Sequence, residues 1–187
     1  MDRRCFILLL ALPLCIAPLH TRADASSAAR LSPVIARALS YERTLSNRAG
    51  GSLDILIVHA ANNAASQGEA AAFSRGLAAL SRSTVQGLPM RASVVPYSPS
   101  AIEAGAAEGV DVVVICSGLD SSLSALTAAT RRRRLLTVGV ERRHAVAATT
   151  LAVLIEDGRA KIIVNLAHAR AEGVELSSQL LRLAEVL

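Results

Sequence analysis

Apolar runs alternate with amphipathic stretches along this chain, and the alternation predicts an α/β fold. Two apolar runs, residues 53–59 and 110–116, have the length expected of strands buried on both faces of a sheet, and residues 90–96 and 135–140 predict two further strands. Three stretches with helical spacing lie between them: residues 69–86, 98–109 and 119–130. Because parallel neighbours need long crossovers, this order predicts a mostly parallel sheet with helices on both faces. Any binding groove is then expected at the carboxyl ends of the strands.

The carboxyl-terminal part predicts a different arrangement, a β-hairpin followed by a helix. Asp157-Gly158 separates two apolar runs at 151–156 and 159–165, and this dipeptide favours a two-residue turn with positive φ at both positions. Three further helical segments are predicted around the hairpin: a turn at 144–148, a short helix at 167–172 closed by Gly173, and a last helix capped by Ser177 or Ser178. The expected fold is therefore a mixed sheet with a carboxyl-terminal hairpin plus helix.

The first 25 residues predict a signal peptide. Two arginines precede an apolar stretch at 5–19, which prolines interrupt and which is too short for a comfortable membrane span. Ala23 and Ala25 give the small-x-small cleavage pattern, so the mature chain is expected to start near Ser26. We therefore expect a single exported domain over 26–187, in the periplasm.

The first helix of this domain is predicted to begin at Ser32-Pro33. Serine is a common helix cap, and proline fits the first helical position because its missing N–H is not needed there. Apolar residues recur at helical spacing over 34–45, and Gly50-Gly51 predicts the end of the helix.

Composition narrows the classes of function. Hydrophobic residues make up 52% of the chain and aromatic residues only 2%, with no Trp, which argues against platforms that stack bases or sugars. The net charge of +5 suits an acidic partner or membrane surface without specifying either, and export argues against nucleic acid. Cys5 and Cys15 lie in the predicted signal, so Cys116 alone remains and no internal disulfide is expected. Cys15 leaves a lipoprotein signal as an alternative, although Pro13-Leu14 fits that signal poorly.

Catalytic and metal-binding residues are weakly indicated. Cys116-Ser117-Gly118 follows a strand, and His59 ends another, so a Cys-dependent hydrolase is one alternative. Without an acidic orienting group or a recognised nucleophile motif, we interpret Cys116 as a small buried apolar residue instead. The histidines His59, His144 and His168 are far apart in the sequence, and no metal site or cofactor is predicted.

Two features have both a structural and a functional interpretation. The densest charge in the chain is the run Arg131, Arg132, Arg133 and Arg134. The run is either a solvated helix end or an anchor for a carboxylate, phosphate or anionic lipid head. Asn165 ends the last predicted strand, where it either initiates a turn or lines a groove.

The carboxyl-terminal segment is similar to a known family. Residues 161–187 read KIIVNLAHARAEGVELSSQLLRLAEVL and resemble the signature of the YfiR family: a strand ending in Asn-Leu, an Ala/Arg-rich turn, a Gly, then Ser-Ser and a Leu-rich helix. Residues 38–43, 111–118 and 136–139 match more weakly, in the same order. The resemblance implies a periplasmic, non-enzymatic regulator that binds and represses the outer part of an inner-membrane signalling protein, such as a diguanylate cyclase in cyclic-di-GMP signalling or a sensor kinase. Some relatives carry paired cysteines, which this chain lacks.

The candidate contact surfaces for such a partner are the first helix (34–45) and the last helix (178–187). The candidate residues for binding a partner or ligand are Arg37, Arg43, Ser177 and Ser178, together with Arg131, Arg132, Arg133, Arg134 and Asn165. A periplasmic small-molecule-binding protein is the main alternative, and a homodimer is a further possibility for the partner.

Overall fold

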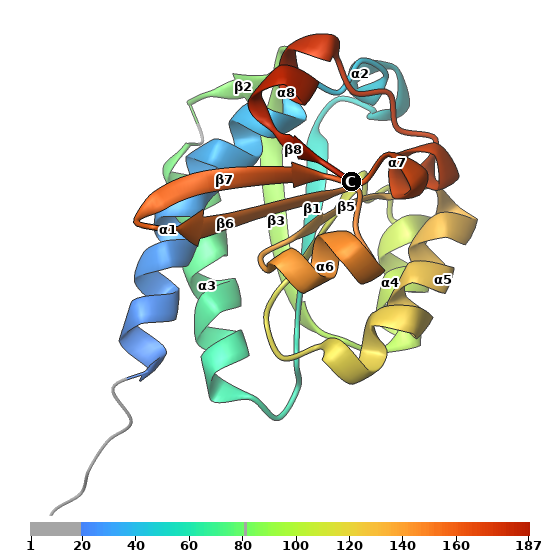
Figure 1. Cartoon of the computed structure of the whole chain (residues 1–187). Coiled ribbons are helices and arrows are strands. Elements are labelled where there is room, and N and C mark those ends of the chain that lie inside the picture. The colour runs from blue at the N-terminus through green and yellow to red at the C-terminus, as the bar shows by residue number, and fades with distance from the viewer. Residues whose placement is uncertain (1–19, 81) are drawn as a thin grey trace, which may run out of the picture.

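The computed structural model describes residues 20–80 and 82–187, with side chains from residue 26 onward, and it shows one eight-stranded sheet with helices on both faces (Figure 1). The strands are β1 (Leu53–His59), β2 (Thr84–Val85), β3 (Leu88–Pro96), β4 (Val112–Ile115), β5 (Leu136–Gly139), β6 (Leu151–Glu156), β7 (Arg159–Val164) and β8 (Glu185–Val186). The helices are α1 (His20–Leu39), α2 (Leu45–Arg48), α3 (Ala64–Ala79), α4 (Pro99–Ala107), the 3₁₀ turn η1 (Asp120–Ser122), α5 (Leu123–Arg133), α6 (Arg142–Ala147), α7 (Leu166–Glu172) and α8 (Ser178–Leu183).

The strand order is β2-β3-β1-β4-β5-β6-β7-β8. The pairs β3–β1, β1–β4, β4–β5 and β5–β6 are parallel, whereas β7 runs antiparallel to β6 and β2 antiparallel to β3. The expected mixed, mostly parallel sheet with a carboxyl-terminal hairpin and helix is therefore confirmed.

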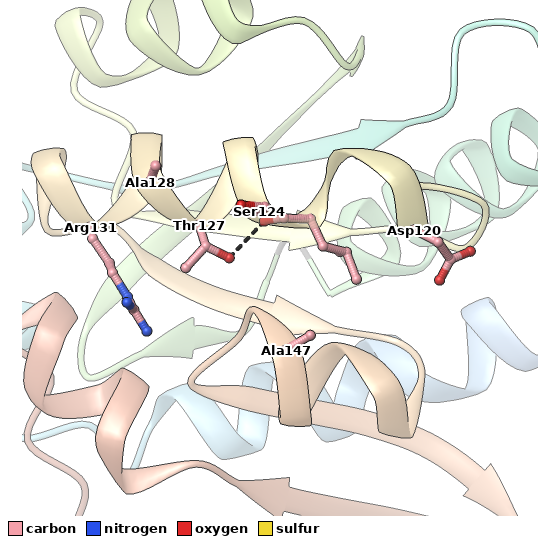
Figure 2. Close-up of a pocket in the computed structure, with 7 residues that line it drawn as sticks. Asp120, Ser124, Thr127, Ala128, Arg131 and Ala147 are labelled. Atoms are coloured by element: carbon pink, nitrogen blue, oxygen red, sulfur yellow. Dashed lines mark hydrogen bonds between the residues drawn. The ribbon is translucent and has the colours of Figure 1, made fainter.

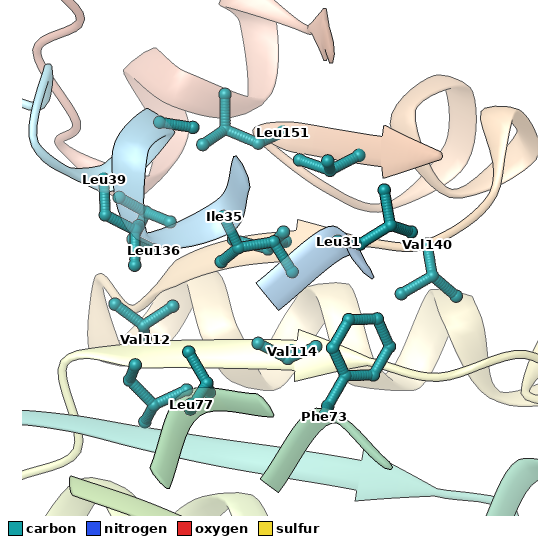
Figure 3. Packing of buried hydrophobic residues seen from close by; sticks show 14 of the residues in the cluster. Leu31, Ile35, Leu39, Phe73, Leu77, Val112, Val114, Leu136, Val140 and Leu151 are labelled. Carbon is teal, nitrogen blue, oxygen red and sulfur yellow. The ribbon is translucent and has the colours of Figure 1, made fainter. Parts of the chain in front are cut away.

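Alternate residues of the central strands pack into two separate layers of the core, which explains why these strands are apolar at most positions. Ile55 and Ile57 of β1 face the layer of α1 and α3, and Leu56 and Val58 face the layer of α4 and α5. Figure 3 shows the first layer, where Phe73 of α3 and residues of α1 pack over the central strands. A core of this kind is built almost entirely from aliphatic side chains, as the composition predicts.

The predicted start of the first helix is wrong, because α1 begins at His20 and includes Pro33 in its interior. Ala28 and Leu31 are buried against the rest of the domain, so packing extends the helix beyond the proline. The Ser32 hydroxyl does not cap the helix but donates to the Ala28 carbonyl, at 3.0 Å. The helix also ends early, at Leu39, and only the short α2 precedes Gly50. Residues 1–19 of the predicted signal peptide lie outside the described residues.

Other boundaries also differ from the prediction. The second helix begins at Ala64, five residues before the predicted start at 69, because the Asn63 side chain caps it by accepting from the Ser66 N–H. The second helix ends at Ala79, and the residues assigned to its last turns form β2 and the turn at Gln86-Gly87, both with positive φ. The final helix ends at Leu183, and the chain then adds the short strand β8 beside β7. In both places a two-residue strand is too short to leave a periodic signal.

The hairpin and several caps are confirmed. Asp157 and Gly158 have φ values of 50° and 74°, as a two-residue hairpin turn of the predicted type requires. The Ser98 hydroxyl accepts from the Ala101 N–H at the start of α4, and Gly173 closes α7 with a φ of 70°. Within the described ranges, no helix combines the length and hydropathy needed to cross a bilayer.

Candidate functional site

The chain reverses its direction of winding between β1 and β4, at the edge of the sheet where the parallel strands end. From β1 the chain passes to β3 on one side and then to β4 on the other side. Open α/β sheets place their binding crevice at such a point. A cavity of about 410 Å³, here called the crevice, lies beside this point, over the carboxyl ends of β4, β5 and β6. Its lining residues are Ser27, Leu31, Glu69, Ser117, Val140, Glu141, Arg142, Leu154 and Ile155.

Glu69 of α3 ties the two loops of the crevice together. Its Oε2 atom accepts hydrogen bonds from the Ser117 N–H at 2.7 Å and the Ser117 hydroxyl at 2.9 Å. The Ser66 hydroxyl in turn donates to the Ser117 carbonyl, at 2.7 Å. The loop after β4 is thus fixed against the first turns of α3, and Glu69 as a whole is only 8% exposed. The crevice is preformed, as ligand sites usually are.

The far wall of the crevice carries an ion-pair network. Arg142 donates to both carboxylate oxygens of Glu185, at 2.5 and 3.1 Å, and to Glu156 at 3.1 Å. Lys161 also contacts Glu156 and Glu185. Hydrogen bonds from Arg142 and Lys161 lower the pKa of Glu185 to about 2. Because Arg142 is already neutralised by these carboxylates, it is a poor anchor for a ligand anion.

Cys116 lacks the features of a nucleophile. The side chain is fully buried, and burial together with the nearby Glu69 carboxylate raises the pKa of the thiol, which disfavours the reactive thiolate. His59 points its Nδ1 atom at the Ala60 carbonyl, 3.1 Å away. The structure therefore favours the interpretation of Cys116 as a small buried apolar residue.

Asp120, Glu141 and His144 form a cluster that the sequence analysis did not identify, since Asp120 comes from a different loop. Their potential ligand atoms lie within 4.8 Å of one another. However, the Val140 N–H donates to His144 Nδ1 at 3.3 Å, which places the proton of the neutral ring on Nε2, the atom that faces Glu141. Arg143 pairs with both carboxylates. A protonated Nε2 and a guanidinium occupy the positions a metal would need, so this donor set fits an ion-paired cluster better than a metal.

The four consecutive arginines lie at the end of α5. Arg131 to Arg133 form its last turn, and Arg134 is the cap, with a φ of 53°. Arg132 and Arg133 pair with Glu103 of α4, at 2.8 and 2.6 Å. Arg131 instead points into a shallow groove between α5 and α6 (Figure 2). Its Nη2 atom lies 2.7 Å from His168 Nδ1. Besides Arg131, this groove of about 570 Å³ is lined by Asp120, Leu123, Ser124, Thr127, Ala128 and Ala147.

Asn165 acts as the cap of α7. Its side-chain oxygen accepts from the N–H groups of Ala167 and His168, at 3.0 and 3.1 Å, and its Nδ2 atom donates to the Ala145 carbonyl at 2.9 Å. With these bonds the amide anchors α7 to α6. Asn165 is not among the residues that line the crevice or the α5–α6 groove.

The remaining candidate residues meet where the end of α1 approaches the start of α8. The Ser177 N–H donates to the Tyr41 carbonyl at 2.9 Å, and the Arg43 N–H donates to the Glu175 carbonyl at 2.7 Å. Ser177 caps α8, of which Ser178 is the first residue. The Arg37 guanidinium lies over the Tyr41 ring, 5.1 Å from its centroid. The candidates therefore separate into two surfaces, one at α1–α8 and one at the end of α5.

The buried carboxylate of Glu42 holds the α1–α8 surface together, and sequence reasoning missed it. It accepts from the Thr44 N–H and hydroxyl at 2.9 and 2.6 Å and from the Glu175 N–H at 2.9 Å. The sequence around Glu42 gives no sign of this bond, because its partner Glu175 is 133 residues away.

Comparison with solved structures supports the fold. A domain from Streptococcus pneumonia, solved with L-Trp and described as an ABC domain, has a TM-score of 0.60 at 12% identity, with 88% of this chain and 62% of that chain covered. A conserved domain protein from Vibrio cholerae also has a TM-score of 0.60 at 12% identity, covering 85% and 59%. The substrate-binding protein CD0873 from Clostridium difficile has a TM-score of 0.56 at 14% identity, covering 77% and 57%. The chain thus spans about three fifths of each structure.

Sequence comparison gives the family. No curated protein matches the chain significantly. The family model described as DUF4154, YfiR/HmsC-like, matches residues 63–185, which is most of the part that forms the sheet and includes the carboxyl-terminal segment singled out above. The chain belongs to the YfiR/HmsC-like family.

Proposed function

We propose that this protein is a periplasmic regulator that binds the periplasmic part of an inner-membrane signalling protein, a diguanylate cyclase or a sensor kinase, and represses it. The family match over residues 63–185 is the observation that supports this proposal. The mature form is a single domain that starts near Ser26, after removal of the signal peptide. The domain needs no catalytic group, because a protein that binds one conformation of a sensor more tightly than another shifts its population.

The α1–α8 surface is the proposed contact for the partner. The apolar side of α1 is buried in the core, since Leu31, Ile35 and Leu39 are at most 3% exposed. Only the polar side of this helix is therefore available for contact with a partner. The carboxyl-terminal end is different: Leu183, Val186 and Leu187 are 66%, 43% and 46% exposed, an apolar edge next to α8. Exposed apolar side chains flanked by arginines are typical of a protein interface.

The experiment replaces the arginines on this surface and leaves the core untouched. In Arg37→Glu/Arg43→Glu, repression of the cognate sensor should weaken while the melting temperature stays near that of the wild type. Arg75→Glu/Arg91→Glu is the matched control, because both side chains are exposed and lie on α3 and β3. If deletion of the whole gene leaves the output of every neighbouring membrane sensor unchanged, the regulator function is wrong.

A second candidate function is binding of a small molecule in the crevice at the carboxyl ends of β4, β5 and β6. The preformed cavity beside Glu69 and Ser117 favours it, and one similar structure was solved with L-Trp. A thermal-shift screen with amino acids, nucleotides and metabolites tests this function directly. A ligand that raises the melting temperature of the wild type but not of Ser117→Ala would support it; no shift with any compound would count against it.

A further inference from the structure

Three helices end at one place on the surface, and each brings arginine there. The Nη1 atom of Arg48, in the last turn of α2, donates to the Arg134 carbonyl at 3.2 Å, which joins α2 to the end of α5. The Arg131–His168 contact joins α5 to α7, whose last turn contains Arg170. Gly173, which closes α7, lies against the Arg134 side chain. We call Arg48, Arg131, Arg132, Arg133, Arg134 and Arg170 the arginine patch; α5 and α7 are neighbours on the right of Figure 1.

Little acidic charge balances this patch on its solvent side. Glu103 is the one carboxylate shown to form ion pairs with its members in the described part of the chain. Arg131 is bonded to His168, whose pKa is lowered by burial and by Arg131 itself, so the ring is neutral near pH 7. Three further acids lie near the patch or near its members in the sequence. Glu172 is fully buried, Asp111 is partly buried and interacts with Arg48, and Glu175, two residues after Gly173, is exposed. Arg131, Arg132, Arg133, Arg134 and Arg170 are exposed, whereas the Nε and Nη2 atoms of Arg48 are buried, so Arg48 adds positive charge to the patch but no solvent-facing donor from these two atoms.

Helix dipoles explain only part of this accumulation. The carboxyl end of a helix carries about half an elementary negative charge, and short helices such as α2 and α7 carry less. One or two cations are sufficient to offset the three helix ends. The remaining guanidinium groups give a positive surface, and such groups bind phosphate oxygens well because their N–H donors are arranged as a planar fork.

We propose that the arginine patch binds the anionic phospholipid surface of the membrane that carries the signalling partner. This inference rests on the periplasmic location in the proposed function. Successive residues in a helix point about 100° apart, so Arg131, Arg132 and Arg133 spread outward and do not converge on one small anion. A planar surface of phosphate headgroups accommodates spread arginines, and it would hold the domain beside the exported part of a membrane protein.

The test measures binding of the purified protein to vesicles of phosphatidylcholine, with and without phosphatidylglycerol, by co-sedimentation. The wild type should bind the phosphatidylglycerol vesicles and not the pure phosphatidylcholine vesicles, and added salt should weaken binding. The patch variant is Arg133→Gln/Arg134→Gln/Arg170→Gln, which leaves Arg132 on Glu103. Since each arginine near an anionic surface contributes about 1 kcal/mol, this variant should bind about a hundredfold more weakly.

The matched control is Arg75→Gln/Arg82→Gln/Arg91→Gln, which removes the same charge from exposed positions on α3, β3 and the segment before β2. It should retain binding within a few-fold of the wild type. The proposal is wrong if both variants lose vesicle binding equally, or if the wild type does not bind phosphatidylglycerol vesicles. If the wild type ignores the vesicles but the patch variant no longer represses the sensor, an acidic protein surface is the partner instead. If the wild type binds phosphatidylglycerol vesicles but deletion of its gene changes no signalling output, the proposed function is wrong and the lipid-binding proposal stands.

Discussion

The Glu172 carboxylate accepts two hydrogen bonds from a single residue, Thr137, whose N–H lies 3.0 Å from Oε2 and whose hydroxyl lies 2.6 Å from Oε1. The Thr150 hydroxyl adds a third bond, to Oε2 at 2.8 Å. The carboxylate thus connects the end of α7 to β5 and to the start of β6, at a site with no solvent exposure. Despite these bonds, burial raises the pKa of Glu172 to about 7.

This raised pKa predicts that Glu172 makes the fold less stable as pH rises. The folded protein holds the proton more tightly than the unfolded chain, whose glutamate has the ordinary pKa of 4.5. The stabilisation is fully present below pH 4.5 and is lost as pH rises through about 7, a total of about 3 kcal/mol. Glu172→Gln should remove this loss, because the amide does not ionise.

The measurement is urea unfolding of the wild type and of Glu172→Gln between pH 4.5 and 8. Burial also lowers the pKa values of His144 and His168, and their opposite contribution in this range is common to both proteins. The difference between the two unfolding free energies therefore isolates Glu172. If this difference does not change with pH, the carboxylate keeps an ordinary pKa and the prediction is wrong.

The contact of α1 with α3 leaves no room at Gly76. A Cβ atom added there would lie 2.3 Å from Ser32 Oγ and 2.7 Å from Ser32 Cβ. Gly76→Ala should therefore destabilise the protein by about 1–3 kcal/mol, since the helices must separate. Gly68→Ala is a matched control on the same helix, where an added Cβ meets nothing within 4 Å. It should be neutral or stabilising by up to about 1 kcal/mol, because alanine favours helix; equal effects in thermal unfolding would refute the tight contact.

The β6–β7 hairpin depends on positive φ at its turn. Gly158→Val should destabilise the domain by about 1–3 kcal/mol, because a β-branched residue resists this conformation. The cost is conformational, as an added Cβ at Gly158 meets nothing within 4 Å. Gly50→Val, equally open but without a positive φ, should shift the melting temperature much less. An unchanged melting temperature in Gly158→Val would contradict the turn.

If the predicted signal peptide is cleaved near Ser26, the exported protein should start within α1. Cleavage near Ser26 would remove the first turns of α1, since this helix begins at His20. The buried contacts of Ala28 and Leu31 lie beyond the cleavage point and should hold the rest of the helix in place. Mass spectrometry of the periplasmic fraction should show a protein that lacks the first twenty-odd residues. An intact amino terminus in the cytoplasm would contradict export.

The sequence predicted the sheet well because the central strands are mostly apolar. The run at 53–59 matches β1 in both bounds, and Asp157-Gly158 marked the hairpin by a local requirement on φ. The end of α3 and the start of α1 were wrong, because contacts with remote elements decide those boundaries. Pro33 was interpreted as a helix start, yet it lies inside a helix that packs on α3.

The candidate site was predictable only in its position. The strand order implied a crevice at the carboxyl ends, but not that Glu69 would bind Ser117, 48 residues away. The arginine run was visible in the sequence, whereas the contribution of Arg48 was not, since its partner Arg134 lies 86 residues away. Hydrogen bonds between remote residues leave no pattern along the chain. They can be found only when the three-dimensional arrangement of the helices and strands is known.

Cys116 offers a last prediction, which separates a buried thiol from an activated one. An activated cysteine is exposed and has a lowered pKa, whereas Cys116 is fully buried and burial raises its pKa. Iodoacetamide at pH 7 should therefore alkylate the exported protein at least about a hundredfold more slowly than the same protein unfolded in urea. Cys116→Ala should leave sensor repression unchanged, which tests the residue without relying on its reactivity. Rapid alkylation of the folded protein, with a rate that reports a thiolate at neutral pH, would revive the hydrolase alternative, because no other cysteine is expected in the mature chain.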